Sequence, residues 1–75
     1  MNRPVVVINP NSNQTVTDGL EKSLIHFNQF EGFFIECVTL EEGPFGIESQ
    51  LDSDSVVIPL ANLVQTRKDA AAFVI

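Results

Sequence analysis

An unbroken run of β-branched residues, Val5-Val6-Val7-Ile8, restricts the fold of this chain more than any other feature. It lies between Pro4 and Asn9, and it is continuously apolar rather than alternating. Such a run is typical of a strand buried on both faces, as in a parallel sheet that helices cover on both sides. We therefore predict a strand at residues 4–8 and an α/β fold.

A helix is predicted to follow this strand. Residues 15–18, Thr-Val-Thr-Asp, fit a capping box, with Asp18 near the positive end of the helix dipole. The helix is expected to end before Gly32. Its apolar residues recur at helical spacing and form one stripe: Val16, Leu20, Leu24 and Phe27.

The second half of the chain predicts two further strands with helix between them. Residues 33–40 are β-rich and carry one charge, Glu36, which indicates a strand near a sheet edge. Residues 47–68 have a helical pattern, and Pro59 is expected to divide it into two pieces. The apolar residues 71–75 form the third strand. Right-handed crossovers then give a three-layer βαβαβ unit with a short parallel sheet, in the strand order 2-1-3.

Composition excludes several classes of protein. Ten acidic against four basic residues give a net charge of −6, so no nucleic-acid partner is expected, because phosphate neutralisation needs clustered Lys and Arg. The longest apolar run, residues 56–64, is far shorter than the roughly 20 residues of a membrane helix, so no membrane partner is expected either. Without a recognisable leader, a cytoplasmic location is the default. The single cysteine, Cys37, forms no internal disulfide and no metal-ligand set.

Polar residues follow the first strand, at the edge where open parallel sheets bind ligands. In the order 2-1-3 the strand order reverses beside this loop. The loop, residues 9–13, places amide and hydroxyl groups ahead of a helix N-terminus, whose free N–H groups attract anions. A carboxylate or a cyclic imide would fit there. The competing interpretation, which these residue types favour when taken alone, is that they only turn the chain and cap the helix.

No catalytic pair is expected within these residues. Cys37 lies inside the second predicted strand, which is typical of a structural thiol. His26 has no acid or cysteine at ligand spacing, and we expect it on a half-exposed helix face. Glu41, Glu42 and Glu48 are candidates for a general base, although acidic surface residues more often serve solubility.

Two motifs occur at a characteristic separation. Residues 8–12, Ile-Asn-Pro-Asn-Ser, follow the valine-rich strand and precede Thr15 and Thr17; residues 42–49, Glu-Gly-Pro-Phe-Gly-Ile-Glu-Ser, follow the second strand. Together they resemble the hydantoin and allantoin racemases of the aspartate/glutamate racemase superfamily. The resemblance extends over the whole chain, to Ile75.

This resemblance implies a racemase, without cofactor or metal, that acts on 5-substituted hydantoins, allantoin or related amino-acid derivatives. In that family two cysteines, one in each of two similar domains, act as base and acid on opposite faces of a carbon acid. The resemblance places both cysteines beyond Ile75, so residues 1–75 would be a single incomplete α/β domain, the inactive N-terminal portion. The carried-over substrate-binding residues, for a carboxylate or hydantoin-like substrate, are Asn9, Pro10, Asn11, Ser12, Gly43 and Pro44.

Two functions from other classes stay open. A chain this small buries only about 60% of its extended surface, so additional partner surface is expected. The first alternative is an association module that self-associates through the edge of the C-terminal strand, and Val74→Lys should then weaken dimerisation. The second is a small-anion-binding protein that uses residues 9–12. Titration with carboxylates or hydantoins, comparing the unmodified chain with Asn11→Ala, tests it, and it is excluded if neither binds.

Overall fold

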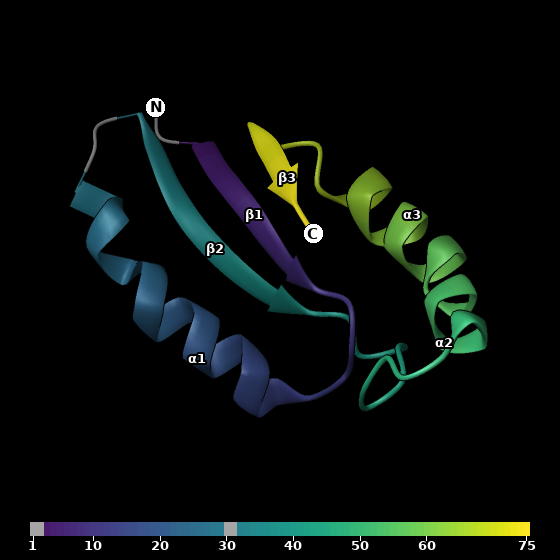
Figure 1. Ribbon diagram of the computed structural model, residues 1–75. Helices are drawn as coiled ribbons and strands as arrows, with labels where there is room; N and C mark the ends of the chain where they lie inside the picture. Colours follow the sequence, from purple (N-terminus) through teal and green to yellow (C-terminus); the bar gives the residue numbers. More distant parts are fainter. Residues whose placement is uncertain (1–2, 30–31) are drawn as a thin grey trace.

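Three parallel strands alternate with helices along the chain. A computed structural model describes residues 3–29 and 32–75. The strands form one sheet in the order β2-β1-β3, and the α-helices of the two crossovers lie on opposite sides of it (Figure 1). This confirms the predicted three-layer α/β unit and its strand order. The elements are β1 (Arg3–Asn9), α1 (Gln14–Leu24), the 3-10 helix η1 (Ile25–Gln29), β2 (Phe33–Thr39), α2 (Gln50–Ser55), α3 (Val57–Thr66) and β3 (Ala72–Val74). None of the helices in the described ranges has the length and apolarity to cross a membrane.

β1 occupies the centre of the sheet, but only one of its faces is closed. On the α3 side Val6 and Ile8 are 0% and 2% exposed, whereas Val5 and Val7 on the α1 side are half-buried. The difference arises because α1 packs chiefly against β2. The prediction of a strand buried on both faces is therefore confirmed on the α3 side and wrong on the α1 side.

α1 begins two residues earlier than the sequence pattern indicates. The residue that caps it is Asn13, whose side-chain oxygen accepts a hydrogen bond from the Thr15 backbone N–H at 3.1 Å, so the predicted capping box at residues 15–18 is wrong. The predicted apolar stripe is also incomplete. Val16 is 43% exposed, and Phe27 lies beyond α1 in η1, whereas the buried residue of α1 is Thr17.

The two helical pieces after β2 meet at Val56 rather than at Pro59. Val56 ends α2 and caps α3, and it is one of the few fully buried apolar residues. Pro59 lies in the first turn of α3, where its missing N–H needs no partner. Because the proline ring would clash with the carbonyl of Ser55 in a continuous helix, the break must precede Pro59 by one turn.

β3 is shorter than predicted and forms one edge of the sheet. It comprises Ala72–Val74, and the Ala71 N–H donates to the Pro4 carbonyl at 2.8 Å just before it. Arg3 and Asn9 bond to the residues that flank β2, so the odd-numbered positions of β1 face β2 and the even-numbered ones face β3. With Val5 aligned with Ala72, the backbone groups of Ala72 and Val74 face β1, and those of Phe73 point away from it. At the opposite edge, the outward N–H of Ile35 in β2 is occupied by the Asn28 side chain at 2.5 Å.

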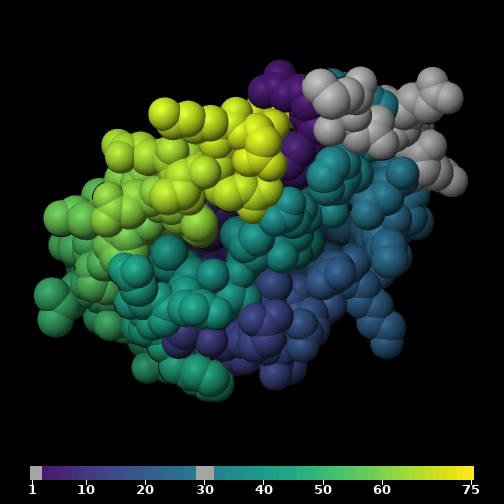
Figure 2. Space-filling view, turned by 180° about the vertical axis from the view of Figure 1, so that it is seen from behind, coloured from purple at the N-terminus to yellow at the C-terminus, as the bar shows by residue number. Residues whose placement is uncertain are grey.

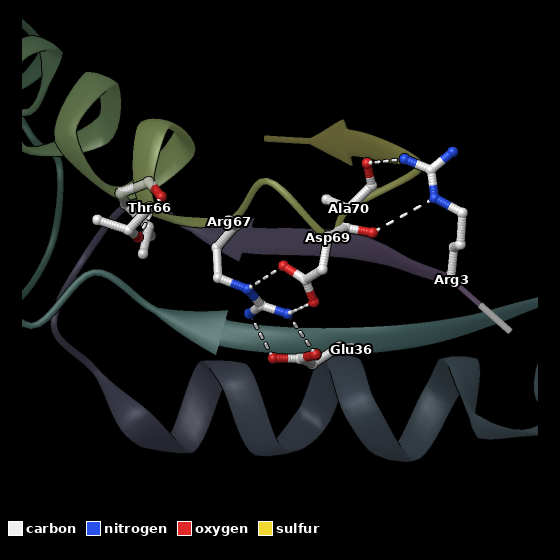
Figure 3. A network of polar contacts seen from close by, with 7 residues as sticks. Arg3, Glu36, Thr66, Arg67, Asp69 and Ala70 are labelled. Atoms are coloured by element: carbon white, nitrogen blue, oxygen red, sulfur yellow. Dashed lines mark hydrogen bonds and ion pairs between the residues drawn. The ribbon is translucent and has the colours of Figure 1, made fainter. Parts of the chain in front are cut away.

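A cluster of charged residues joins the end of α3 to the sheet (Figure 3). The Arg67 guanidinium makes two hydrogen bonds to the Glu36 carboxylate, at 2.6 and 2.8 Å, and two to Asp69, both at 3.1 Å. Arg3 donates to the backbone carbonyl of Ala70 at 2.9 Å. Hydrogen bonding to Arg67 lowers the pKa of Glu36 and of Asp69 below their usual values. The one charge of the predicted edge strand is therefore paired.

Candidate functional site

The two loops predicted to bind substrate lie in direct contact at the carboxyl edge of the sheet. The Ser12 N–H donates to the carbonyl oxygen of Pro44 at 2.8 Å, and the Leu40 N–H donates to that of Asn9 at 3.0 Å. All the residues carried over from the resemblance, residues 9–12 together with Gly43 and Pro44, therefore gather beyond the ends of β1 and β2. Sequence separation alone does not require this contact.

Gly43 permits the close approach of these loops. A Cβ atom at this position would lie 2.6 Å from the Pro10 carbonyl oxygen and 3.2 Å from that of Leu40, and both are backbone atoms. The Gly43 N–H also donates to the Leu40 carbonyl at 2.9 Å, which forms a tight turn after β2. The absence of a side chain is thus a steric requirement here.

Alternate asparagines hold the first loop. The side-chain oxygen of Asn9 accepts from the Asn11 N–H at 3.2 Å, that of Asn11 accepts from the Asn13 N–H at 3.0 Å, and that of Asn13 caps α1. Each bond spans two residues, which is the geometry of an Asx turn. These side chains therefore turn the chain and start the helix, as the competing interpretation proposed.

Asn9 also anchors a buried chain of hydrogen bonds between the sheet and α1. It is 2% exposed, and its side-chain nitrogen donates to the Asn13 carbonyl and to Thr17 Oγ1, both at 3.1 Å. Thr17 and Thr39 hydroxyls lie 2.6 Å apart, and Thr39 donates to Gln14 Oε1 at 2.8 Å. Because Thr39 has one hydroxyl hydrogen and gives it to Gln14, Thr17 must donate to Thr39. Asn9 is fully engaged and acts as a positioning residue.

Most donors in the first loop are already used within the chain. The backbone N–H groups of Asn11, Ser12, Asn13, Thr15 and Val16 all donate to protein acceptors. The expectation of free N–H groups at this helix N-terminus is therefore not met for these residues. Within residues 9–17, the groups that make no hydrogen bond and remain available to a ligand include the Asn11 side-chain nitrogen and the Ser12 hydroxyl.

A cleft of about 300 Å³ lies beside the loops, between the end of β2 and α3. It begins immediately before Gly43 but is not lined by the predicted binding residues. Of the candidate bases, Glu41 and Glu42 line it, whereas Glu48 does not. The sequence analysis did not single out Asn62 and Thr66. Two polar residues one turn apart on an otherwise apolar helix lie on the same face, and this spacing could have indicated a polar lining there. The lining residues are Thr39, Leu40, Glu41, Glu42, Pro59, Asn62, Leu63 and Thr66.

The remaining reactive side chains lie away from this edge. Cys37 is half-buried in β2, beneath α1, and burial together with the nearby Glu21 carboxylate raises the pKa of its thiol. A raised pKa opposes formation of the nucleophilic thiolate. His26 is exposed in η1, with its ring centroid 4.1 Å from that of Phe27. Within residues 3–29 and 32–75, no group of three or more His, Cys, Asp or Glu side chains is arranged to hold a metal ion.

This edge of the sheet thus has available hydrogen-bond donors, a contact between two loops that depends on Gly43, and an adjacent cleft with two acidic residues. Comparisons of the chain with family models, with curated proteins and with solved structures found no match.

Proposed function

We propose that this chain is the N-terminal portion of a cofactor-independent racemase of hydantoins, allantoin or related amino-acid derivatives, and that it supplies one wall of the substrate site. The observation that supports this is the contact of the two motif-bearing loops, through Ser12 and Pro44 and through Gly43 and Pro10. We place the protein in the cytoplasm, where a lone thiol such as Cys37 stays reduced.

The available donors favour a neutral carbonyl over a free carboxylate. Asn11 and Ser12 offer uncharged N–H and O–H donors, and Asn9 holds the loop that carries them. Glu41 and Glu42 on the adjacent cleft repel a second negative charge. A hydantoin or ureide ring, whose carbonyls are uncharged, therefore suits this wall better than a simple carboxylate.

Catalysis requires groups that residues 1–75 do not supply. Deprotonation at carbon needs a thiolate on one side of the substrate and a proton donor on the other. Cys37 lies within β2, and its raised pKa opposes the thiolate form. In this proposal both catalytic thiols belong to sequence beyond Ile75. The 75-residue chain should therefore cause no loss of optical rotation in L- or D-5-substituted hydantoins, whereas a version extended through a second domain should; turnover by residues 1–75 alone would refute the assignment.

Ligand binding can be tested without catalysis. We would follow backbone amide shifts of the ¹⁵N-labelled chain during titration with allantoin, a 5-substituted hydantoin and acetate. Asn11→Asp keeps the oxygen that accepts from Asn13 but removes the side-chain N–H donors. Loss of one hydrogen bond should weaken hydantoin binding by up to about tenfold.

A second test variant and a control complete that titration. Ser12→Ala removes the other donor and leaves the backbone hydrogen bond to Pro44 intact, so it should weaken binding in the same way. Ser53→Ala replaces an exposed residue of α2 that belongs to neither loop, and it should change nothing. If the unmodified chain binds neither hydantoins nor carboxylates, or if Asn11→Asp binds as well as the unmodified chain, the proposed wall is wrong.

A further inference from the structure

Half of one sheet face is left without a covering helix. Thr39 of β2 bonds to Thr17 of α1, so the odd-numbered positions of β2 face α1. The register aligns Val5 with Ile35 and Ala72, and Val7 with Cys37 and Val74. The side chains of Val5, Val7, Ala72 and Val74 therefore lie on the α1 side of the sheet, where α1 packs chiefly against β2.

Aromatic residues extend this uncovered area toward η1. An almost entirely apolar cleft of about 290 Å³ is lined by Val5, Phe27, Phe33, Phe34 and Ile35. Phe27, Phe33 and Val74 are 45%, 54% and 53% exposed, although each is a large apolar side chain. Figure 2 shows the C-terminal segment, in yellow, lying uncovered at the molecular surface. We call the set of Val5, Val7, Phe27, Phe33, Ala72 and Val74 the open face.

The size of the molecular surface indicates that an area of this kind is normally covered. The accessible surface is 5201 Å², whereas a compact monomer of this mass exposes about 4,600 Å². The radius of gyration is 12.9 Å, against about 11 Å for a compact chain of this length. The excess of roughly 600 Å² is counted over the whole molecule, including exposed apolar residues of α2 and α3 such as Leu51 and Ile58, and it approaches the roughly 800 Å² that each partner buries in a standard interface.

The residues of the open face do not repel a second copy, despite the net charge of −6. The strand positions of the open face are Val, Val, Phe, Ala and Val, so no carboxylates meet when two such faces approach. Glu36 points to the opposite side, toward Arg67, and Glu41 and Glu42 lie at the carboxyl edge. We propose that two copies of this chain pack their open faces together about a two-fold axis. This inference goes beyond the proposed function and does not rest on it.

Pairing of the β3 edges, the self-association expected from the sequence, is the competing arrangement. β3 has three residues, and of these only Phe73 directs its backbone groups outward, so edge pairing buries little area. Phe33 distinguishes the two arrangements. It lies on β2, on the far side of β1 from β3, and an edge dimer leaves it exposed.

Sedimentation equilibrium of the 75-residue protein tests the proposal. We would compare the unmodified chain with Phe33→Lys, Val74→Lys and the control Leu51→Lys, which replaces a residue 78% exposed on α2, from about 1 μM to about 1 mM. The unmodified chain should dimerise within this range. Phe33→Lys and Val74→Lys should each raise the dissociation constant by at least about tenfold, and Leu51→Lys should leave it unchanged.

Each other outcome overturns the open-face dimer. A chain that stays monomeric has no such interface, loss of dimer in Val74→Lys alone indicates edge pairing, and an equal loss in Leu51→Lys indicates non-specific association. Circular dichroism checks that each variant folds. Where a lysine variant does not fold, a mixture of isotopically labelled and unlabelled unmodified chains provides the test. The open-face dimer requires intermolecular nuclear Overhauser effects at both Phe33 and Val74. Their absence at Phe33 contradicts the open-face dimer.

Discussion

Single side chains control how the two loops and α1 fit onto the sheet. Thr17 is the clearest case, because a polar residue rather than the apolar stripe is the buried contact of α1. It accepts from Asn9 and donates to Thr39, so its hydroxyl satisfies groups on two strands at once. Helical periodicity could not reveal this, since a threonine becomes the inward residue only when its partners come from elsewhere in the chain.

Thr17→Val tests that hydroxyl at nearly constant volume. The change leaves an Asn9 N–H without its acceptor and Thr39 without a donor, so the free energy of unfolding should fall by about 1–3 kcal/mol in urea denaturation. Thr15→Val is the matched control, because Thr15 is exposed in the same helix. An equal loss in the two variants would show that the buried hydroxyl contributes nothing specific.

Gly43→Ala tests the contact between the loops. The added methyl group would lie 2.6 Å from a backbone oxygen, so one loop must move, and we expect a loss of about 1–3 kcal/mol in the free energy of unfolding. At Gly46 the nearest atom to a new Cβ is a flexible Glu48 oxygen at 3.9 Å. Gly46→Ala should therefore leave stability nearly unchanged, and a comparable loss there would contradict the steric explanation.

At the scale of elements, the sequence predicted what local patterns control and failed where tertiary contacts decide. Two strands were correctly indicated, by the β-branched run at residues 5–8 and by the β-rich run at residues 33–40. The right-handedness of the crossover connections gave the order of the strands in the sheet. The predicted start of α1 was wrong because Asn13 is the N-cap residue, whereas residues 15–18 only fit the sequence pattern of a capping box. The helix break was placed at Pro59 itself, although a proline acts on the carbonyl one turn before it.

The sequence predicted that a polar loop follows the first strand at the carboxyl edge of the sheet, but it did not predict the hydrogen bonds of that loop. Residues 9–12 follow the first strand, and the strand order reverses beside them; residues 43–44 were carried over to the same substrate site by the resemblance alone. The side-chain oxygens of Asn9 and Asn11 accept hydrogen bonds from the backbone of the loop itself. This bonding depends on dihedral angles that no sequence pattern specifies. The cleft along α3 was missed because Asn62 and Thr66 are separated from Thr39 by more than twenty residues of sequence.

The ion cluster that links β2 to the segment after α3 should make stability depend on pH. Arg67 lowers the pKa of Glu36 in the folded state, so the pair stabilises the fold above the unfolded-state pKa of roughly 4.3 and is lost as pH falls through the folded-state pKa. The side chain of Glu36 is 36% exposed, so after allowance for solvent screening the contribution is about 1 kcal/mol or less.

Urea denaturation at a series of pH values measures this contribution. Between about pH 6 and pH 3 the unmodified chain should lose more stability than Glu36→Gln, which has no carboxylate to protonate at this position. Glu48→Gln, at an exposed position whose side chain makes no contact with Arg67, should lose stability as the unmodified chain does. Parallel pH profiles for the unmodified chain and Glu36→Gln would refute the linkage.

At the scale of the whole molecule, the sheet is covered unevenly on its two faces. Principal dimensions of 39 × 25 × 15 Å describe a flat body. Among the residues that the structure describes, the buried apolar ones are Val6, Ile8, Leu40 and Val56. Val6 and Ile8 lie on the α3 side of β1, whereas Val5 and Val7 on the α1 side are only half-buried, so the apolar core on that side is small. A second copy would complete that core.

Dimerisation through the open face predicts a melting temperature that depends on concentration. Mass action favours the folded dimer as the protein concentration rises, so Tm should increase by several degrees over a hundredfold range. Val74→Lys should melt at one temperature throughout that range. A constant Tm in the unmodified chain would contradict coupling between folding and association.

The contact between the loops also bears on chemical ageing. Asparagine followed by serine is prone to deamidation, in which the next backbone nitrogen attacks the side-chain carbonyl carbon and ammonia departs. At Asn11 that nitrogen belongs to Ser12, whose N–H donates to the Pro44 carbonyl at 2.8 Å. The side-chain carbonyl oxygen of Asn11 accepts a hydrogen bond from the Asn13 N–H, which holds the side chain in place. Folding therefore protects Asn11 from the cyclic succinimide. If Gly43→Ala separates the loops, succinimide and isoaspartate should accumulate at this residue during storage.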